Sequence, residues 1–285
     1  MAIVIKTPEE IEILREGGKR LGFILGEVAK MVKPGISTEE LNQYAVKLIK
    51  EGGRALRSLA RPAKPWRSGG EEGDEAAFLN YKPEGAKHPY PAALCVSVND
   101  EVVHGIPRRE RILKEGDIVS LDCGLKHRGL YTDHAITLPV GKVNKEIEKL
   151  LEVTEKALYV GIEAARAGGH VGDIGYAIEQ FVKQNVPSGV EGPHKYGIVR
   201  VLSGHGVGKS IHEDPYVPNF GRRGSGEKLK IGMVIAIEPM LNLGSYAVFL
   251  DKDGFTYKTR DRSVSAHFEH TVVITKNGPE ILTKV

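Results

Sequence analysis

Apolar residues recur at helical spacing in two segments near the N-terminus. One segment begins at Thr7 and the other at Ser37, and a glutamate follows each of these residues three positions later. This arrangement is a capping box, which satisfies free amide groups at the start of a helix. We expect the first helix to end near residues 33–35 and the second at Gly52 and Gly53. Their apolar stripes are Ile11, Leu14, Leu21 and Leu25 in the first, and Leu41, Ala45 and Leu48 in the second.

Residues 113–138 have the composition of two strands joined by a turn. The arms, 117–122 and 131–138, are rich in apolar and β-branched residues, and the segment between them contains two glycines. A turn centred between residues 127 and 128 would place Asp122 directly opposite Asp133. Like charges in that position destabilise a sheet, so the pair favours a shared proton or shared cations. The alternative is that one aspartate caps the turn and the other is solvated.

The same order of elements starts again after residue 143. Asn144 is expected to cap a third helix, Gly168 and Gly169 to end it, and Asp173 to open a fourth helix before further strand-like runs. The polar residues repeat too. Residues 103–107 recur as 211–215, 113–122 as 229–238, and 133–134 as 269–270, so each half contributes a histidine and two carboxylates: His104, Asp122 and Asp133, then His212, Glu238 and Glu269.

We therefore predict one catalytic domain, residues 1–285, with an internal repeat of roughly 8–140 and 144–275. An approximate two-fold axis between the halves would bring the four carboxylates to one central point. Such a cluster would become protonated unless cations lie among its members, and two divalent ions would fit the symmetry.

One position breaks the repeat, because His205 precedes His212 by seven residues whereas Ser97 precedes His104 by seven. His205 lies between glycines in a strand-like segment, and we interpret it as a fifth ligand. One imidazole and four carboxylates favour Mn, Fe or Co, with Zn also compatible. His104 and His212 then remain beside the metals, where they would donate to a substrate carbonyl or leaving nitrogen, or only orient a ligand.

A different interpretation of residues 203–210 is a phosphate-binding loop. The segment ends in Gly-Lys-Ser, but its first glycine is replaced by Ser203, and strand-like residues follow where a helix should begin. We regard this nucleotide-binding alternative as much weaker.

Bulk composition excludes several classes of protein. Forty basic and 37 acidic residues give a net charge of +3, too small to indicate a nucleic-acid substrate. Cys95 and Cys123 form no CxxC pair, no apolar run reaches membrane-spanning length, and no signal peptide is evident, so we expect a cytoplasmic protein. Residues 57–88 have loop composition and are interpreted as a solvated insertion or a docking segment.

The motifs together resemble the type I methionine aminopeptidases over nearly the whole chain. They are residues 99–107 (NDEVVHGIP), 203–208 (SGHGVG), 237–240 (IEPM) and 265–271 (SAHFEHT). The resemblance implies an α+β fold, the duplicated "pita-bread" fold, in which an antiparallel sheet is flanked by helices on one side with the metal site at the centre. It also implies removal of the initiator methionine from nascent polypeptide N-termini when the second residue is small.

The resemblance further implies the role of each site residue. Asp122, Asp133, His205, Glu238 and Glu269 would bind two divalent ions (Co, Mn, Fe or Zn), His104 and His212 would contact substrate, and Glu238 would be the general base. A metal-bound hydroxide would attack the first peptide bond. His88, Tyr90 and Cys95 match positions of the substrate pocket, and a monovalent cation is implied near Asn99, Glu101 and Ser265. Ile211 stands where a phenylalanine is common in the family, and Phe255 stands where a tryptophan is common. Both keep this part of the pocket apolar.

Partner and assembly expectations follow only from the resemblance, and they are docking on the ribosome and a monomeric state. Two alternatives remain, a prolidase-like Xaa-Pro peptidase and a non-catalytic homologue that binds peptide. Prolidases usually carry a long additional N-terminal domain, for which there is no room before Asp122.

Overall fold

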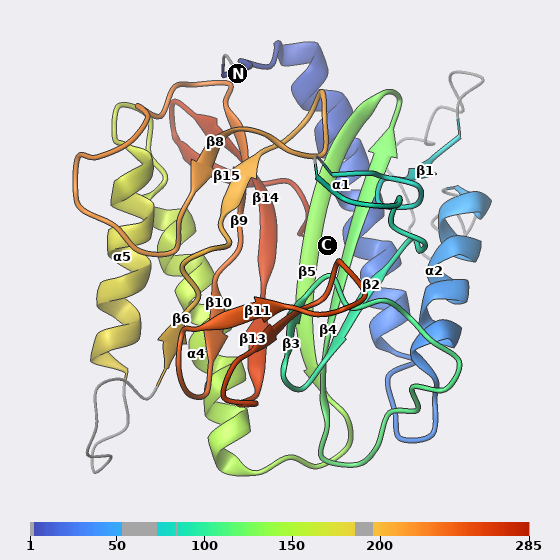
Figure 1. Cartoon of the computed structure of the whole chain (residues 1–285). Helices are drawn as coiled ribbons and strands as arrows, with labels where there is room; N and C mark the ends of the chain where they lie inside the picture. The colour runs from blue at the N-terminus through green and yellow to red at the C-terminus, as the bar shows by residue number, and fades with distance from the viewer. Residues whose placement is uncertain (1–2, 53–72, 84, 186–195, 285) are drawn as a thin grey trace.

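The computed structural model describes residues 3–52, 73–83, 85–185 and 196–284 (Figure 1). Residues 57–72 and residue 84 of the expected insertion lie outside this range, so the prediction for them is not tested here. Among the helices of the described residues, none has both the length and the apolar character needed to cross a membrane.

Three of the helices begin where the capping residues predict. Thr7 caps α1 and Ser37 caps α2, each with a complete capping box, and Asn144 caps α4. Two boundaries differ from the prediction, because α1 already ends at Ala29 and α5 has His170 at its N-cap, with Asp173 at the third helical position accepting the His170 amide. The helices are α1 (Pro8–Ala29), α2 (Thr38–Glu51), α4 (Lys145–Ala164) and α5 (Val171–Gln184).

The strands of the described residues form one large sheet and two small ones, and all the pairings among them are antiparallel. The large sheet has the order β1-β4-β5-β14-β9-β7-β8, with β2 beside β4 and β15 beside β14. Its strands are β1 (Glu75–Ala76), β2 (Cys95–Val98), β4 (Ile118–His127), β5 (Leu130–Pro139), β7 (Gly204–Gly206), β8 (Glu213–Val217), β9 (Val234–Ile237), β14 (Glu269–Thr275) and β15 (Gly278–Ile281). The small sheets are β11 (Val248–Leu250), β12 (Tyr257–Thr259) and β3 (Glu101–Val103), and β13 (Ser265–His267), β10 (Met240–Asn242) and β6 (Gly197–Ile198).

The predicted hairpin is β4 and β5, but its register differs from the expectation. Its turn is Arg128 and Gly129, with φ of 49° and 81°, and this two-residue turn pairs His127 with Leu130. Asp122 therefore faces Ala135, and Asp133 faces Gly124. The prediction that the two aspartates face each other directly is wrong. They are diagonal neighbours on the same face of the sheet.

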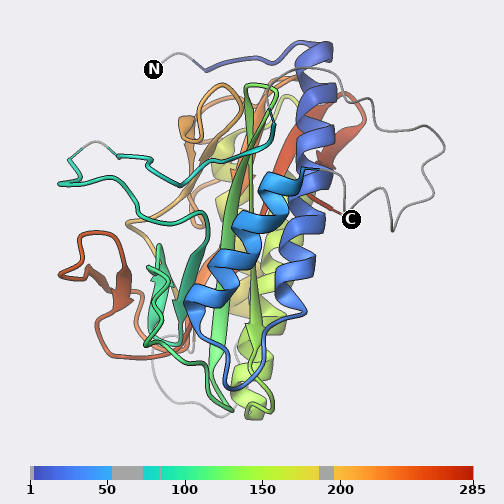
Figure 2. The ribbon, with the colours of Figure 1, turned by 90° about the vertical axis from the view of Figure 1, so that its right-hand side faces the viewer.

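Helices cover one face of the large sheet, and the other face carries the polar residues. On the covered face, Leu121 and Cys123 of β4 pack with α1 and α2, while Ile235 of β9 and Val272 of β14 pack with α4 and α5. Figure 2, which views the sheet from its edge, shows α1 and α2 on one side and the small sheet of β3, β11 and β12 on the other. Because side chains alternate along a strand, Asp122 points away from the helices. The predicted α+β architecture with an antiparallel sheet and helices on one side is confirmed.

Candidate functional site: a carboxylate and histidine cluster

A cavity of about 440 Å³ lies over the central strands on the face that the helices leave free. It is lined by the expected metal ligands together with both expected substrate-contacting histidines. These residues are Asp122, Asp133, His205, Glu238, Glu269, His104 and His212.

Three of the carboxylates come from the central strands. Asp122 of β4, Ala135 of β5 and Glu269 of β14 form one row across the sheet, and Asp133 lies on the same face. The Thr271 hydroxyl accepts from the Asp133 amide at 2.8 Å and donates to the Asp133 carbonyl at 2.7 Å. This hydroxyl fixes the backbone on which Asp133 stands.

Glu238 and His205 complete the cluster from the neighbouring strands. Glu238 follows β9, and its Oε1 lies 3.5 Å from His205 Nε2. His205 donates Nδ1–H to the Gly206 carbonyl at 2.9 Å, which leaves the Nε2 lone pair free to bind a metal. One ligand atom each of Asp133, His205 and Glu269 lie within 4.8 Å of one another.

The segment that carries His205 also decides against a phosphate-binding loop. Residues 204–206 form β7, and β8 (Glu213–Val217) follows where such a loop requires a helix. The nucleotide-binding interpretation is therefore rejected.

The electrostatics of the cluster call for cations. Burial raises the pKa of Asp133 to about 7 and that of Glu238 to about 8, and burial together with the neighbouring carboxylates raises the pKa of Asp122 and Glu269 well above their usual range. Within the described residues, Asp122 Oδ1 and Glu269 Oε1 are buried without a hydrogen-bond partner. Oxygen atoms left unpaired beside an imidazole are the donor set of a divalent cation, so the residues fit the expected metals.

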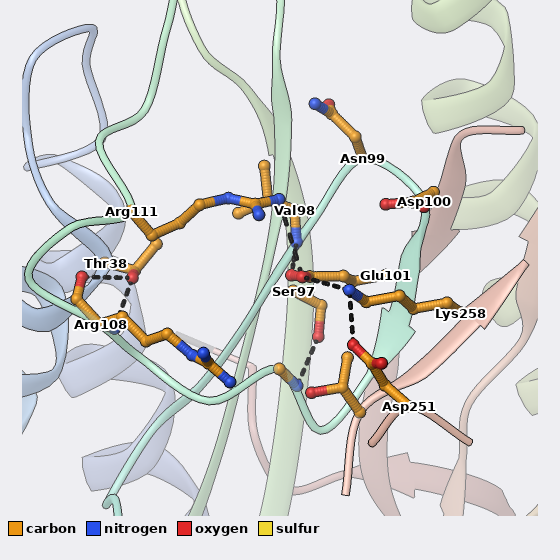
Figure 3. Close-up of polar contacts among 12 residues, drawn as sticks. Thr38, Ser97, Val98, Asn99, Asp100, Glu101, Arg108, Arg111, Asp251 and Lys258 are labelled. Atoms are coloured by element: carbon orange, nitrogen blue, oxygen red, sulfur yellow. Dashed lines mark hydrogen bonds and ion pairs between the residues drawn. The ribbon is translucent and has the colours of Figure 1, made fainter. Parts of the chain in front are cut away.

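His104 lies at the end of β3, in a left-handed conformation with φ of 60°. The segment 97–108 that carries it is held by polar contacts within the segment and with β12 (Figure 3). Ser97 Oγ accepts from the Gly105 amide at 3.0 Å, and Glu101 accepts from the Val98 amide at 2.9 Å. Lys258 lies 3.6 Å from Glu101 and 2.7 Å from Asp251. Burial, followed by the nearby His212 and His267, lowers the pKa of His104 to about 4, so its imidazole is neutral at neutral pH.

His212 lies at the rim of the cavity, and distant parts of the chain hold it. The Tyr81 hydroxyl is 2.9 Å from His212 Nδ1. The next residue, Glu213, accepts from the Ser210 amide at 2.9 Å and pairs with Lys6 Nζ at 2.5 Å. The side chains of this ion pair are only 1% and 8% exposed.

The apolar part of the cavity contains some of the expected substrate-binding residues. Tyr90, Cys95 and Phe255 line it, and the ring of Tyr90 lies 5.3 Å from that of Phe255. His88 and Ile211 do not line it. His88 packs its exposed ring against Phe255 at 4.9 Å, and Ile211 is buried in the core cluster that also contains Tyr90 and Phe255.

Two residues of the site were given no role from the sequence. His267 lies in β13 with Nε2 3.4 Å from Glu238 Oε2, and Tyr81 holds His212. The only signal for His267 was its place within the motif 265–271, two positions before Glu269. Tyr81 gave no signal, because its partner lies 131 positions away in the sequence.

Comparison with known proteins agrees with the geometry of the site. The model of metallopeptidase family M24 matches residues 12–276. The chain is 45% identical to a methionine aminopeptidase of Aquifex aeolicus, with 100% of both chains covered. It is 41% identical to methionine aminopeptidase 1 of Bacillus subtilis, with 99% of this chain and 100% of the other covered.

Solved structures of methionine aminopeptidases are also similar to this chain. The crystal structure of a methionine aminopeptidase from Thermotoga maritima superposes with a TM-score of 0.85 at 39% identity, and 100% of both chains is covered. A prolidase from Pyrococcus furiosus has a TM-score of 0.67 at 22% identity, and the match covers 99% of this chain but 66% of the prolidase. The second likeness concerns the fold alone.

Proposed function

Because this chain belongs to metallopeptidase family M24 and has the pita-bread fold of that family, we propose that it is a methionine aminopeptidase. Its substrates are the N-termini of nascent polypeptides whose second residue is small. The observation that carries the proposal is the buried carboxylate and imidazole cluster at the base of a cavity with an apolar wall.

Membership of this family implies a divalent metal. We propose two ions, Co, Mn, Fe or Zn, bound by the five cluster residues. Bound there, such ions supply a water nucleophile active at neutral pH and positive charge beside the scissile carbonyl. The raised pKa of the four carboxyl groups means that protons compete with metal, so metal affinity should rise with pH. The ligands are Asp122, Asp133, His205, Glu238 and Glu269.

The other residues divide into proton carriers and substrate contacts. Glu238 serves as the general base that takes a proton from the attacking water. His104 and His212 donate hydrogen bonds to the substrate carbonyl or leaving nitrogen. Neutral His104 can donate only from the ring nitrogen that carries its proton. Tyr90, Cys95 and Phe255 surround the methionine side chain, and His88 and Ile211 support this wall from behind.

Neither alternative function is as well supported. The prolidases that share the fold are about 62–66% covered by this chain, and their identity to it is low. A homologue that only binds peptide would not need five metal ligands and two histidines around one cavity.

We also propose the remaining features of the family for this chain. It would be a single catalytic domain with an internal repeat of roughly 8–140 and 144–275. The sheet order supports this proposal, because β4 and β5 of the first half lie beside β14 and β9 of the second half. A monovalent cation would lie near Asn99, Glu101 and Ser265, where the Asn99 carbonyl already accepts from the Ser265 amide at 2.8 Å. A cytoplasmic location, a monomeric state and docking on the ribosome complete the proposal.

One assay tests the substrate and the metals together. Metal-free protein is mixed with the peptide Met-Ala-Ser, titrated with Mn, Co, Fe or Zn ions, and assayed for free methionine, with an Xaa-Pro peptide as the control. We expect metal-dependent release of methionine and no cleavage of the control. Cleavage of the Xaa-Pro peptide alone would support the prolidase alternative, and no cleavage with any metal by folded protein would support a binding role.

A further inference from the structure

His267 is a buried imidazole for which the proposed reaction has no use. It is 1% exposed, and neither of its ring nitrogens has a hydrogen-bond partner within the part of the chain that the structure describes. A buried polar group without a hydrogen-bond partner destabilises the fold, so the position of His267 requires a reason. Oε2 of Glu238 lies 3.4 Å from His267 Nε2.

The backbone holds these two side chains in a fixed relation. His267 ends β13 and pairs with Met240 of β10, and Glu238 lies two residues before Met240. The Asn219 side chain donates to the Glu238 carbonyl at 2.9 Å, which fixes that backbone further. The imidazole of His267 in β13 therefore lies near Oε2 of the carboxylate, whereas His205 in β7 lies near Oε1.

The metal-bound state decides which nitrogen of His267 carries the proton. A carboxylate must be ionised to bind a divalent cation, so the oxygens of Glu238 are acceptors in that state. A lone pair on Nε2 would then repel Oε2, whereas an Nε2–H group would donate a hydrogen bond to it.

We propose that His267 is a positioning residue, which donates Nε2–H to Glu238 Oε2 and holds this carboxylate in the orientation that binds metal. The proposal rests on the proposed function, because it takes Glu238 as a ligand. The two histidines beside Glu238 have different roles. His205 offers a lone pair to the metal, and His267 offers a proton to the ligand.

The test measures metal binding in addition to activity. Metal-free wild type, His267→Gln and His267→Leu are titrated with Mn²⁺ by calorimetry, and the absorption spectrum of each is recorded with Co²⁺. Glutamine keeps a donor and leucine has none. We expect the leucine variant to bind Mn²⁺ about 10- to 100-fold more weakly, and the glutamine variant to stay within about threefold of the wild type. Turnover of Met-Ala-Ser should follow the same order.

A further variant keeps the test valid if the leucine variant misfolds. If His267→Leu does not fold, His267→Asn replaces it, since its amide is one methylene shorter than that of glutamine and should bind metal as weakly as leucine does. Equal Mn²⁺ affinity in all variants would overturn the proposal. So would the loss of one Co²⁺ ion in the glutamine and leucine variants alike, because His267 would then be a ligand. Failure of the wild type to bind metal would refute the proposed function itself.

Discussion

His104 and His212 occupy corresponding places in the two halves of the chain, yet they are held in different ways. The segment around His104 has short-range hydrogen bonds within itself, in addition to the contacts that β3 makes with β12. Ser97 holds Gly105 from eight positions away, and Glu101 holds Val98 from three. His212 depends on distant residues, since Lys6 reaches Glu213 over 207 positions and Tyr81 reaches His212 over 131.

This difference shows that two histidines at equivalent positions of a sequence repeat need not be held by equivalent contacts. The repeat specifies which residue faces the cavity, but the supports of the second histidine come from outside the repeated motifs. Lys6 binds Glu213, the residue after His212, and Tyr81 binds His212 itself. A change at Lys6 or at Tyr81 should therefore affect His212 and leave His104 in place.

The largest loss of activity is expected from a change at the centre of the metal cluster, where the two halves of the chain meet. Replacing Glu269 by alanine removes a ligand from the centre of the cluster, so we expect loss of metal and of methionine release. Metal analysis of the purified variant measures this directly. Glu280→Ala, in β15 and paired with Arg15, is a matched control that should keep both. Unchanged metal stoichiometry in Glu269→Ala would contradict the ligand assignment.

The second prediction compares the loss of turnover when each of the two histidines is replaced. His104→Ala and His212→Ala should each lower kcat by about 10²–10³-fold with unchanged metal content, because each removes a donor that stabilises the transition state. Steady-state kinetics and metal analysis test the pair. Equal losses would make the histidines functionally equivalent. Loss of metal in His104→Ala would instead make His104 a ligand.

The third prediction concerns the contribution of the buried Lys6–Glu213 ion pair to the free energy of unfolding. Lys6→Met leaves the Glu213 carboxylate buried without its partner, and such a change typically costs about 3–5 kcal/mol. Urea unfolding measures the loss, and Arg108→Met is the control. Arg108 lies 3.4 Å from Asp253 with its side chain 56% exposed, so its removal should cost less than about 1 kcal/mol. Equal unfolding midpoints for the two variants would contradict this difference between the supports.

The smallest effect isolates the contact of Tyr81. Tyr81→Phe removes one hydrogen bond to His212, which is worth about 1 kcal/mol, and we expect turnover to fall roughly fivefold. The exposed Tyr216 also lines the cavity, and Tyr216→Phe should leave turnover unchanged. In a His212→Ala background, Tyr81→Phe should have no further effect. An equal additional loss in that background would show that Tyr81 acts elsewhere.

The sequence by itself determined the starts of α1, α2 and α4 and the strand pattern, and it predicted which residues make up the site. Capping boxes and apolar periodicity act between residues a few positions apart, so Thr7 and Ser37 could be read without knowledge of the fold. Alternation along β4 placed Asp122 on the face opposite Leu121 and Cys123. The five expected ligands proved to line one cavity.

The tertiary structure alone decided the register and the partners of the site residues. The turn at Arg128 and Gly129 set the register of the central hairpin, because both residues adopt a left-handed conformation that the sequence interpretation did not anticipate. The contacts of Lys6, Tyr81 and His267 join segments that only packing brings together. Side chains far apart in the chain carry no local pattern, so their pairing follows from the position of the strands and not from the order of residues.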